Sequence, residues 1–411
     1  MSGILEGVNP RIQSRPDSPP SNRAVRSTAW LLIAVLLVAA NLRGGITSLG
    51  ALLDSLDGLS AGTRAFLTSL PVLCFAVVGA TGMTLARRLG VHRGIGVALG
   101  LLVAGLLVRV IGDPWLLLAG TFVACAGIAL ANVLLPAVVK EGFPNRVGAV
   151  TGAYSAVMSL GAAIAAGVTV PIAHAAGSWR IGLGVWALLA ALALLAWVPH
   201  LRDRGLRRDG AVRVPLWREP VAWAVTVVFG TQSLFAYVVM SWLPSIYADA
   251  GFSHATAGLL LAVSILVGVP VFFLAPTLAI RASTQGHLIA VLTALLAIGF
   301  AGLWLAPVVG AWLWAVLVGI GGAVFPVTLT LFSIRTATTA GTTALSSMAQ
   351  SIGYLLAAAG PFLVGLLRES TGSWSVPIAL LLGLALGQIC AGYVAGRPVV
   401  IGAHSDTGDV D

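Results

Sequence analysis

The segment WLLIAVLLVAANLRGGITSLGALL, residues 30–53, is apolar enough to cross a bilayer, yet it contains Asn41, Arg43 and the pair Gly44–Gly45. An arginine deep in hydrocarbon costs roughly 3 kcal/mol, and a glycine inside a helix costs about 1 kcal/mol relative to alanine. A membrane span that keeps these residues together indicates a functional position, because packing in lipid alone does not require a charge there.

The composition excludes a soluble globular protein. Of the 411 residues, 58% are hydrophobic and 9% are charged, and the mean hydropathy is +0.99. Soluble proteins carry about a quarter charged residues. The three cysteines, Cys74, Cys125 and Cys390, lie in apolar segments without metal-ligand spacing, so we expect neither a disulfide nor a zinc site. We therefore predict an all-α integral membrane protein.

Twelve segments are long and apolar enough to span the bilayer core, which takes about 20 residues of helix. They are 28–53, 64–86, 94–112, 114–139, 147–173, 180–198, 221–247, 254–280, 286–306, 311–334, 342–367 and 374–396. Lys and Arg gather before the first segment and in the loops after the even-numbered ones, which by the positive-inside rule places both termini in the cytoplasm. The net charge of +9 is then a topology signal, and we expect no nucleic-acid partner.

A polar stretch at 199–220 divides the spans six and six, and the two halves share short similarities. TGAYSAVMSLG (151–161) aligns without gaps to TALSSMAQSIG (343–353), and GLSAGTRAFL (58–67) resembles GFSHATAGLL (251–260). Two bundles related by such a repeat enclose a central cavity and alternate its access by rocking. The predicted parts are a tail at 1–27, six-helix bundles at 28–198 and 221–396, the linker 199–220 and a tail at 397–411.

Five segments together resemble the major facilitator superfamily, and more narrowly its branch of bacterial cyanate permeases and nitroimidazole-type transporters. They are NLRGGITSLGALL (41–53), SLPVLCF (69–75), GIALANVLLPAVVK (127–140), GTQSLFAYVVMSWLP (230–244) and SMAQSIGYLLAAAGPFLVGLL (347–367). The resemblance implies a twelve-helix transporter in the bacterial cytoplasmic membrane. One loop departs from the superfamily pattern: in MTLARRLGVHR (83–93), Met83 and Arg87 stand where glycine and aspartate are usual.

Arg43 is the main candidate for substrate contact. It lies about 22 Å along the first helix, hence in the outer half of an apolar core about 30 Å thick. No Asp or Glu lies deep in any predicted span. A guanidinium that faces a water-filled cavity suits planar anions. The alternative is that Arg43 snorkels to the outer interface.

The residues beside Arg43 have two interpretations each. Gly44 and Gly45 act as a hinge that opens the helix near the site, or they permit close helix packing. Asn41 is about 200° round the helix from Arg43. It shares the cavity only if the helix distorts, and otherwise bonds a neighbouring helix. Thr47 lies one turn above Arg43 on the same face.

Other spans offer further candidates. Gln232 is about 17 Å into the seventh span and so near the midplane, and Tyr237 follows it; we place both in the cavity. Gln350 in the eleventh span is a weaker substrate-binding candidate. Asn132 lies toward the inner end of the fourth span, where cavity and packing roles are equally open.

Three more cations stand near the span ends. We expect Arg109 to snorkel at the outer boundary. Lys140 and Arg335 end the fourth and tenth spans on the inner side. Anchoring at the cytoplasmic interface is the preferred interpretation for both, and a closure contact is the alternative.

The sequence contains no catalytic motif, no phosphate-binding loop and no carboxylate dyad in a span, so we expect no enzyme and no cofactor. We predict a monomeric secondary carrier of a small anionic or polar solute, cyanate-like or another small organic anion. Moving one negative charge inward against 100 mV costs about 2.3 kcal/mol, so uptake calls for a co-transported proton. The alternatives are an exporter of small aromatic or azole compounds and a membrane scaffold or sensor.

Overall fold

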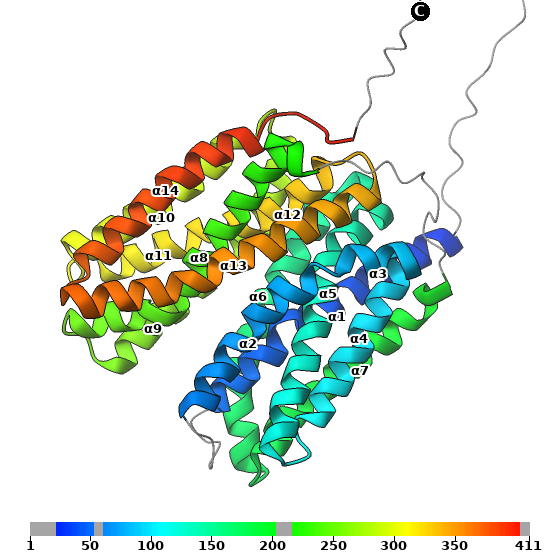
Figure 1. The fold of residues 1–411 in the computed structure, drawn as a ribbon, viewed down its shortest axis with the longest axis horizontal. Helices are drawn as coiled ribbons and strands as arrows, with labels where there is room; N and C mark the ends of the chain where they lie inside the picture. Colours follow the sequence, from blue (N-terminus) through cyan, green and yellow to red (C-terminus); the bar gives the residue numbers. More distant parts are fainter. Residues whose placement is uncertain (1–21, 53–60, 203–215, 403–411) are drawn as a thin grey trace, which may run out of the picture.

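The computed structural model describes residues 22–52, 61–202 and 216–402, and over these ranges it is almost entirely helical (Figure 1). The α-helices are α1 (Asn22–Leu52), α2 (Ala61–Gly79), α3 (Gly82–Leu89), α4 (Val91–Val108), α5 (Pro114–Gly142), α6 (Val147–Ala175), α7 (Trp179–Trp197), α8 (Pro220–Asp249), α9 (His254–Arg281), α10 (Gly286–Leu305), α11 (Ala311–Gly321), α12 (Val324–Ile334), α13 (Thr339–Thr371) and α14 (Ser375–Ala395).

The predicted twelve-span, all-α fold is confirmed. In the described ranges, eleven helical segments are long and apolar enough to cross a membrane, with α11 and α12 together counting as one of them. The bent pair α2 and α3, which meet at 49°, supplies the twelfth. The predicted parts 1–27, 199–220 and 397–411 lie largely outside the described residues, so the domain limits stay a prediction.

The helices form two bundles, one of α1–α7 and one of α8–α14 (Figure 1). In the first bundle α1 packs on α6 and α7, and α4 packs on α5. In the second, α8 packs on α13 and α14, and α10 packs on α11 and α14. The bundles draw together toward the end that carries the start of α1 and the end of α14, which we call the terminal end.

Glycines permit the closest helix contacts within the first bundle. A Cβ on Gly161 of α6 would lie 2.5 Å from the carbonyl oxygen of Ala40 on α1. A Cβ on Gly105 of α4 would lie 2.3 Å from the backbone nitrogen of Ala124 on α5. Neither position has room for a side chain, as expected where helices associate in lipid through small residues.

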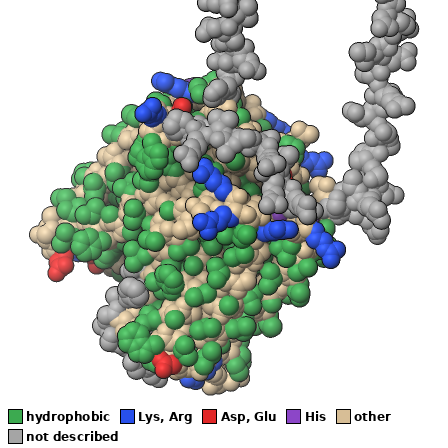
Figure 2. Space-filling view, turned by 45° about the vertical axis from the view of Figure 1, so that its right-hand side comes forward, with side chains coloured by type: hydrophobic (Ala, Val, Ile, Leu, Met, Phe, Trp, Pro, Cys, Tyr) green, Lys and Arg blue, Asp and Glu red, His purple; other side chains and the backbone are tan. Residues whose placement is uncertain are grey.

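Large apolar side chains remain exposed along the outer helix faces. Leu188 and Leu195 on α7, Leu266 on α9 and Leu386 on α14 are each more than half exposed. Figure 2 shows apolar side chains over most of the visible face, with Lys and Arg gathered mainly on its upper part. Such a surface is stable in hydrocarbon and would aggregate in water, because exposed apolar patches of this extent are avoided by soluble monomers.

Candidate functional site

Arg43 lines a cavity between the two bundles. The cavity contains about 660 Å³ of empty space, part of it open to solvent. From the first bundle it is lined by Arg43 of α1 and Ser159 of α6; from the second it is lined by Gln232, Phe235, Ala236, Val239 and Met240 of α8, Ser264, Ile265 and Phe272 of α9, Leu296 of α10, Val318, Gly319 and Gly322 of or next to α11, and Phe325 of α12. None of these lining residues is acidic.

The Arg43 guanidinium is uncompensated in this cavity. Its Cζ atom lies 5.2 Å from the centroid of the Phe325 ring, which belongs to the other bundle. The described residues give the guanidinium no hydrogen bond and no ion pair. Two acids flank the outer ends of the spans: Asp54 lies outside the described residues, and Glu369 is exposed at the end of α13. Five donor protons of Arg43 are therefore available to a solute.

Arg109 has a different position from the predicted one. It is 1% exposed, so the expectation that it snorkels to the outer boundary is wrong. Its Nη1 donates to the carbonyl of Gly45 at 2.7 Å, and its Nη2 donates to Ser48 Oγ and to the carbonyl of Leu183, both at 3.2 Å. The side chain turns inward because these acceptors satisfy it there, and it ties α1 to α4 and α7.

The pair Gly44–Gly45 lies in an unbroken part of α1. A Cβ on Gly44 would lie 3.6 Å from the Gly161 carbonyl, and one on Gly45 would lie 3.6 Å from Ile128 Cδ1. These are ordinary van der Waals distances, so packing alone does not require glycine at either position. The hinge role remains a prediction.

Asn41 and Thr47 lie outside the residues that line the cavity. Asn41 is 3% exposed, and its Nδ2 donates to the carbonyls of Leu37 at 2.8 Å and of Leu189 on α7 at 3.3 Å. Asn41 thus makes the alternative contact, a bond to a neighbouring helix, in an unbroken part of α1. Its contact with substrate stays a prediction. Thr47 Oγ1 donates to the carbonyl of Arg43 at 2.9 Å, which occupies its proton within α1.

Gln232 joins Arg43 in the cavity, whereas Tyr237 does not line it. Gln232 Nε2 lies 3.4 Å from the carbonyl of Gly322, at the break between α11 and α12. Tyr237 is half-buried, is not among the lining residues, and lies within electrostatic range of Arg43. Of the predicted substrate-binding residues, the fold thus brings Arg43 and Gln232 together from opposite bundles.

Gln350 and Asn132 meet at an inter-bundle contact instead of the cavity. Gln350 Nε2 donates to the backbone carbonyl of Asn132 at 3.0 Å and to Ser346 Oγ at 2.8 Å. This bond joins α13 to α5 and uses the amide that we expected to bind substrate. The bond involves only the backbone of Asn132, so substrate binding by the Asn132 side chain stays a prediction, as it does for Gln350.

Further contacts between the bundles close the terminal end of the cavity. Lys140 Nζ at the end of α5 donates to the carbonyls of Ser333, at 2.8 Å, and of Thr336 beyond α12. Ser347 Oγ of α13 donates to the carbonyl of Gly79 at 2.9 Å, where the break between α2 and α3 leaves it free. Lys140 therefore makes the closure contact, and the preferred interpretation of Lys140 as an interfacial anchor is wrong.

Arg335 is neither an anchor nor a bond between the bundles. It is 4% exposed, and its guanidinium donates to the carbonyls of Ala395 and Gly396, both at 3.0 Å, and to Gln285 Oε1. These partners lie at the ends of α14 and α10, so Arg335 joins the helix ends of the second bundle.

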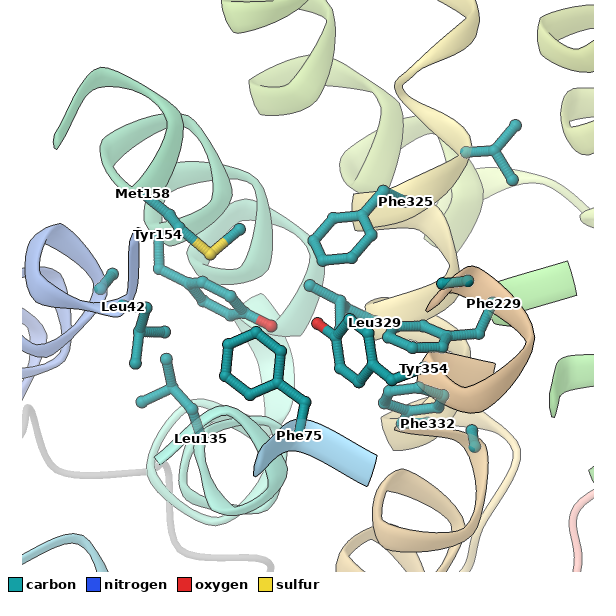
Figure 3. Packing of buried hydrophobic residues seen from close by; sticks show 14 of the residues in the cluster. Leu42, Phe75, Leu135, Tyr154, Met158, Phe229, Phe325, Leu329, Phe332 and Tyr354 are labelled. Atoms are coloured by element: carbon teal, nitrogen blue, oxygen red, sulfur yellow. The ribbon is translucent and has the colours of Figure 1, made fainter. Parts of the chain in front are cut away.

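An aromatic cluster packs between the two bundles (Figure 3). The Phe75 and Tyr354 rings are 4.7 Å apart, Phe229 and Tyr354 are 5.2 Å apart, and Phe229 and Phe325 are 5.7 Å apart, centroid to centroid. The hydroxyl ends of Tyr154 and Tyr354 point toward one another from α6 and α13. This cluster was not predicted, because its rings come from five helices that only the fold brings together.

Two further residues of the site were also missed. Ser159 lines the cavity; the internal repeat, which aligns it with Ser351, was the one available sequence signal. Gln388 of α14, which does not line the cavity, donates from its Nε2 to Gln232 Oε1 at 3.1 Å. A lone glutamine in an apolar span was the only signal for it.

Comparison with known proteins gives consistent results. The sequence profile of the Major Facilitator Superfamily matches residues 24–361. The chain is 38% identical to the "Uncharacterized transporter YycB" of Bacillus subtilis, over 92% of this chain and 96% of that protein. It is 37% identical to the "2-nitroimidazole transporter" of Escherichia coli over 89% of this chain and 95% of that protein. It is 29% identical to the "Cyanate transport protein CynX" of Escherichia coli, over 87% and 95%.

The fold is also that of solved transporters. The proton:xylose symporter XylE superposes with a TM-score of 0.73 at 14% identity, covering 92% of this chain and 98% of that one. At this identity the likeness concerns the fold alone.

Proposed function

The chain belongs to the Major Facilitator Superfamily, a family of membrane transporters of small solutes and not of enzymes, and we propose that its solute is a small anion such as cyanate, held by Arg43. The single observation that carries the proposal is the uncompensated guanidinium of Arg43, which faces the inter-bundle cavity across from Phe325. A charge without a counter-ion in a largely apolar cavity is stabilised when an anion binds. The relative named as a cyanate transport protein supports the choice of solute.

Coupling to protons completes this proposal. Inward movement of a monoanion opposes the membrane potential by about 2.3 kcal/mol per 100 mV, so uptake needs a compensating charge. No lining residue is a carboxylate that would take up the proton. The proton therefore travels with the solute or on an acid outside the cavity.

We assign both termini to the cytoplasm of a bacterial cell, with the chain multi-pass in the cytoplasmic membrane. The support is the gathering of Lys and Arg at the terminal end and in the loops after the even-numbered spans. The closed terminal end is then the cytoplasmic gate, and the cavity opens outward. The carrier works as a monomer, with the two bundles as its moving parts.

A second candidate is an exporter of small aromatic or azole compounds. Phe235, Phe272 and Phe325 line the cavity beside Arg43, and their rings suit stacking with a flat heterocycle. The relative named as a 2-nitroimidazole transporter is 37% identical over most of both chains. Neutral azoles would depend on these rings more than on the Arg43 charge.

Reconstituted protein separates the two candidates. Proteoliposomes with wild type, Arg43→Ala or Arg43→Lys are given labelled cyanate or 2-nitroimidazole, and initial rates are measured. We expect Arg43→Ala to lower cyanate uptake at least tenfold, because a charge-assisted hydrogen bond contributes about 1.5–3 kcal/mol. Arg180→Ala is the control, since Arg180 is exposed and stacks on Trp179.

Unchanged cyanate uptake by Arg43→Ala would refute the anion proposal. Loss of cyanate transport with retained nitroimidazole transport would show that the cavity serves both solutes through different contacts. Movement of nitroimidazole alone, in wild type and Arg43→Ala equally, would favour the exporter.

A further inference from the structure

A buried polar chain runs from the cavity wall into the second bundle. Gln388 of α14 is 0% exposed, and its Nε2 donates to Gln232 Oε1 at 3.1 Å and to Thr293 Oγ1 of α10 at 2.9 Å. Its Oε1 is buried without a hydrogen-bond partner. An unsatisfied buried carbonyl costs about 1–3 kcal/mol, so this arrangement calls for a function that offsets it.

The hydrogen bonds of this series of side chains have a direction, which follows from their donors and acceptors. In the present orientation both N–H groups of Gln388 are bonded and one acceptor is not. If the amide of Gln388 were reversed, both of its N–H groups would face the unpartnered side, and two unsatisfied donors cost more than one unsatisfied acceptor. Gln388 is therefore held as a double donor, and Gln232 must offer it an oxygen.

The orientation of Gln232 follows from that of Gln388. Because Gln232 Oε1 accepts from Gln388, its NH₂ group turns the other way, toward Gly322 and the cavity. One N–H lies at a long 3.4 Å from the Gly322 carbonyl, and the described residues supply no acceptor for the other. The hydroxyl protons of Ser159 and Ser264 are occupied by carbonyls of their own helices. Among the described lining residues, Arg43 and Gln232 thus keep side-chain N–H groups available.

We propose that Gln388 is a positioning residue that determines specificity: it fixes the amide of Gln232 so that the cavity presents N–H groups from both bundles. The cavity then selects a solute with acceptor atoms at two places, one for Arg43 and one for Gln232. An anion with two terminal acceptor atoms meets this requirement. The inference rests on the proposed anion transport and adds a second recognition point to it.

A double-mutant cycle tests the proposal. Gln388→Met, Gln232→Met and the double variant are reconstituted, and the KM and kcat of cyanate uptake are measured. Gln388→Met frees the amide of Gln232 to rotate, so we expect KM to rise about fivefold, the equivalent of one hydrogen bond, with kcat within twofold of wild type. In the Gln232→Met background, Gln388→Met should add nothing, because Gln388 acts only through Gln232.

Thr293 provides matched variants. Thr293→Val removes the second acceptor of Gln388 and should raise KM in the same direction, while Thr293→Ser keeps the hydroxyl and should leave KM unchanged. Melting temperatures are measured for all variants to distinguish a folding defect from a change in specificity. A folding defect would lower the melting temperature and kcat or the amount of active protein, without a selective change in KM.

The outcomes are distinct. A wild-type KM in Gln388→Met, or an equal rise of KM in both backgrounds, would overturn the positioning role while the anion proposal stands. If wild-type protein moves no cyanate, the proposed function fails and this inference fails with it.

Discussion

Three arginines with apolar surroundings in this chain have three different positions. Arg43 faces the cavity without a partner, Arg109 binds carbonyl groups of α1 and α7, and Arg335 binds carbonyl groups at the end of α14. The sequence places all three near apolar segments. Which one stays free depends on whether helix carbonyls lie within reach of the guanidinium, and that is decided by helix packing that no local pattern encodes.

Arg109 should contribute to the stability of the first bundle. Arg109→Ala removes the donor from the carbonyls of Gly45 and Leu183 and from Ser48, and we expect a loss of roughly 1–3 kcal/mol in the free energy of unfolding. Arg109→Lys keeps the charge and some of the bonds and should lose less. Thermal unfolding in detergent measures both.

The exposed Arg180 is the control, since Arg180→Ala should leave the melting temperature unchanged. A melting temperature of Arg109→Ala equal to that of wild type would contradict this account. A stable Arg109→Ala with altered KM would instead indicate that Arg109 acts by positioning the part of α1 that carries Arg43.

Helices as elements were predictable from hydropathy, whereas their breaks were not. The segments predicted at 254–280 and 286–306 are the helices α9 (His254–Arg281) and α10 (Gly286–Leu305). The second predicted span, 64–86, is broken between Gly79 and Gly82. A window average cannot register such a break, and the carbonyl of Gly79 that it frees is where Ser347 bonds across the bundles.

Lys140 at the end of α5 should stabilise the closed terminal end by joining the two bundles; we call this contact the Lys140 latch. Its ammonium group donates to carbonyl groups of Ser333 and Thr336, at the negative end of the α12 dipole. A hydrogen bond that involves a charged group contributes about 1.5–3 kcal/mol, so Lys140→Met should shift the equilibrium away from the terminal-end-closed state at least tenfold.

Spin labels at Arg146 and Ala337, both exposed at the terminal end on opposite bundles, report this shift in double electron–electron resonance after the native thiols are replaced. We expect a longer-distance population in Lys140→Met. Arg281→Met is the control, because Arg281 is an exposed cation at the same end. Equal distance distributions in Lys140→Met and wild type would exclude the latch.

At the scale of the whole molecule, the internal repeat explains where the two bundles touch. The alignment pairs Ser155 of α6 with Ser347 of α13. Ser347 bonds Gly79 across the bundles, and one turn before Ser155 the backbone at Gly152 lies so close to the Phe273 carbonyl that a Cβ there would be 2.2 Å away. The repeat was readable from sequence.

The sequence did not predict that the two bundles contribute differently to the contacts between them and to the cavity. The Ser347 hydroxyl has a partner, whereas the described residues give the Ser155 hydroxyl none. Likewise the cavity takes Arg43 and Ser159 from the first bundle and all its other lining residues from the second. Pairing across the two halves depends on the conformation in which the bundles close, which is a property of tertiary packing.

Proton coupling is a property of the whole transport cycle and predicts a specific response to two gradients. If one proton accompanies each monoanion, no net charge moves, so an imposed potassium-diffusion potential should leave the initial rate of cyanate uptake unchanged. A pH difference of one unit, acid outside, supplies about 1.4 kcal/mol and should support roughly tenfold accumulation at equilibrium. Protein-free liposomes control for leakage of the protonated solute.

The pattern of responses then distinguishes the possible cycles. Uptake accelerated by an inside-positive potential without a pH difference would mean that the anion moves alone, which contradicts coupling. If neither the pH difference nor the membrane potential changed the rate of uptake, the protein would catalyse facilitated diffusion without coupling. Dependence on the pH difference that survives in every variant of the lining residues would show that no lining side chain carries the proton, which leaves the solute itself or an acid outside the cavity, because none of the lining residues is a carboxylate.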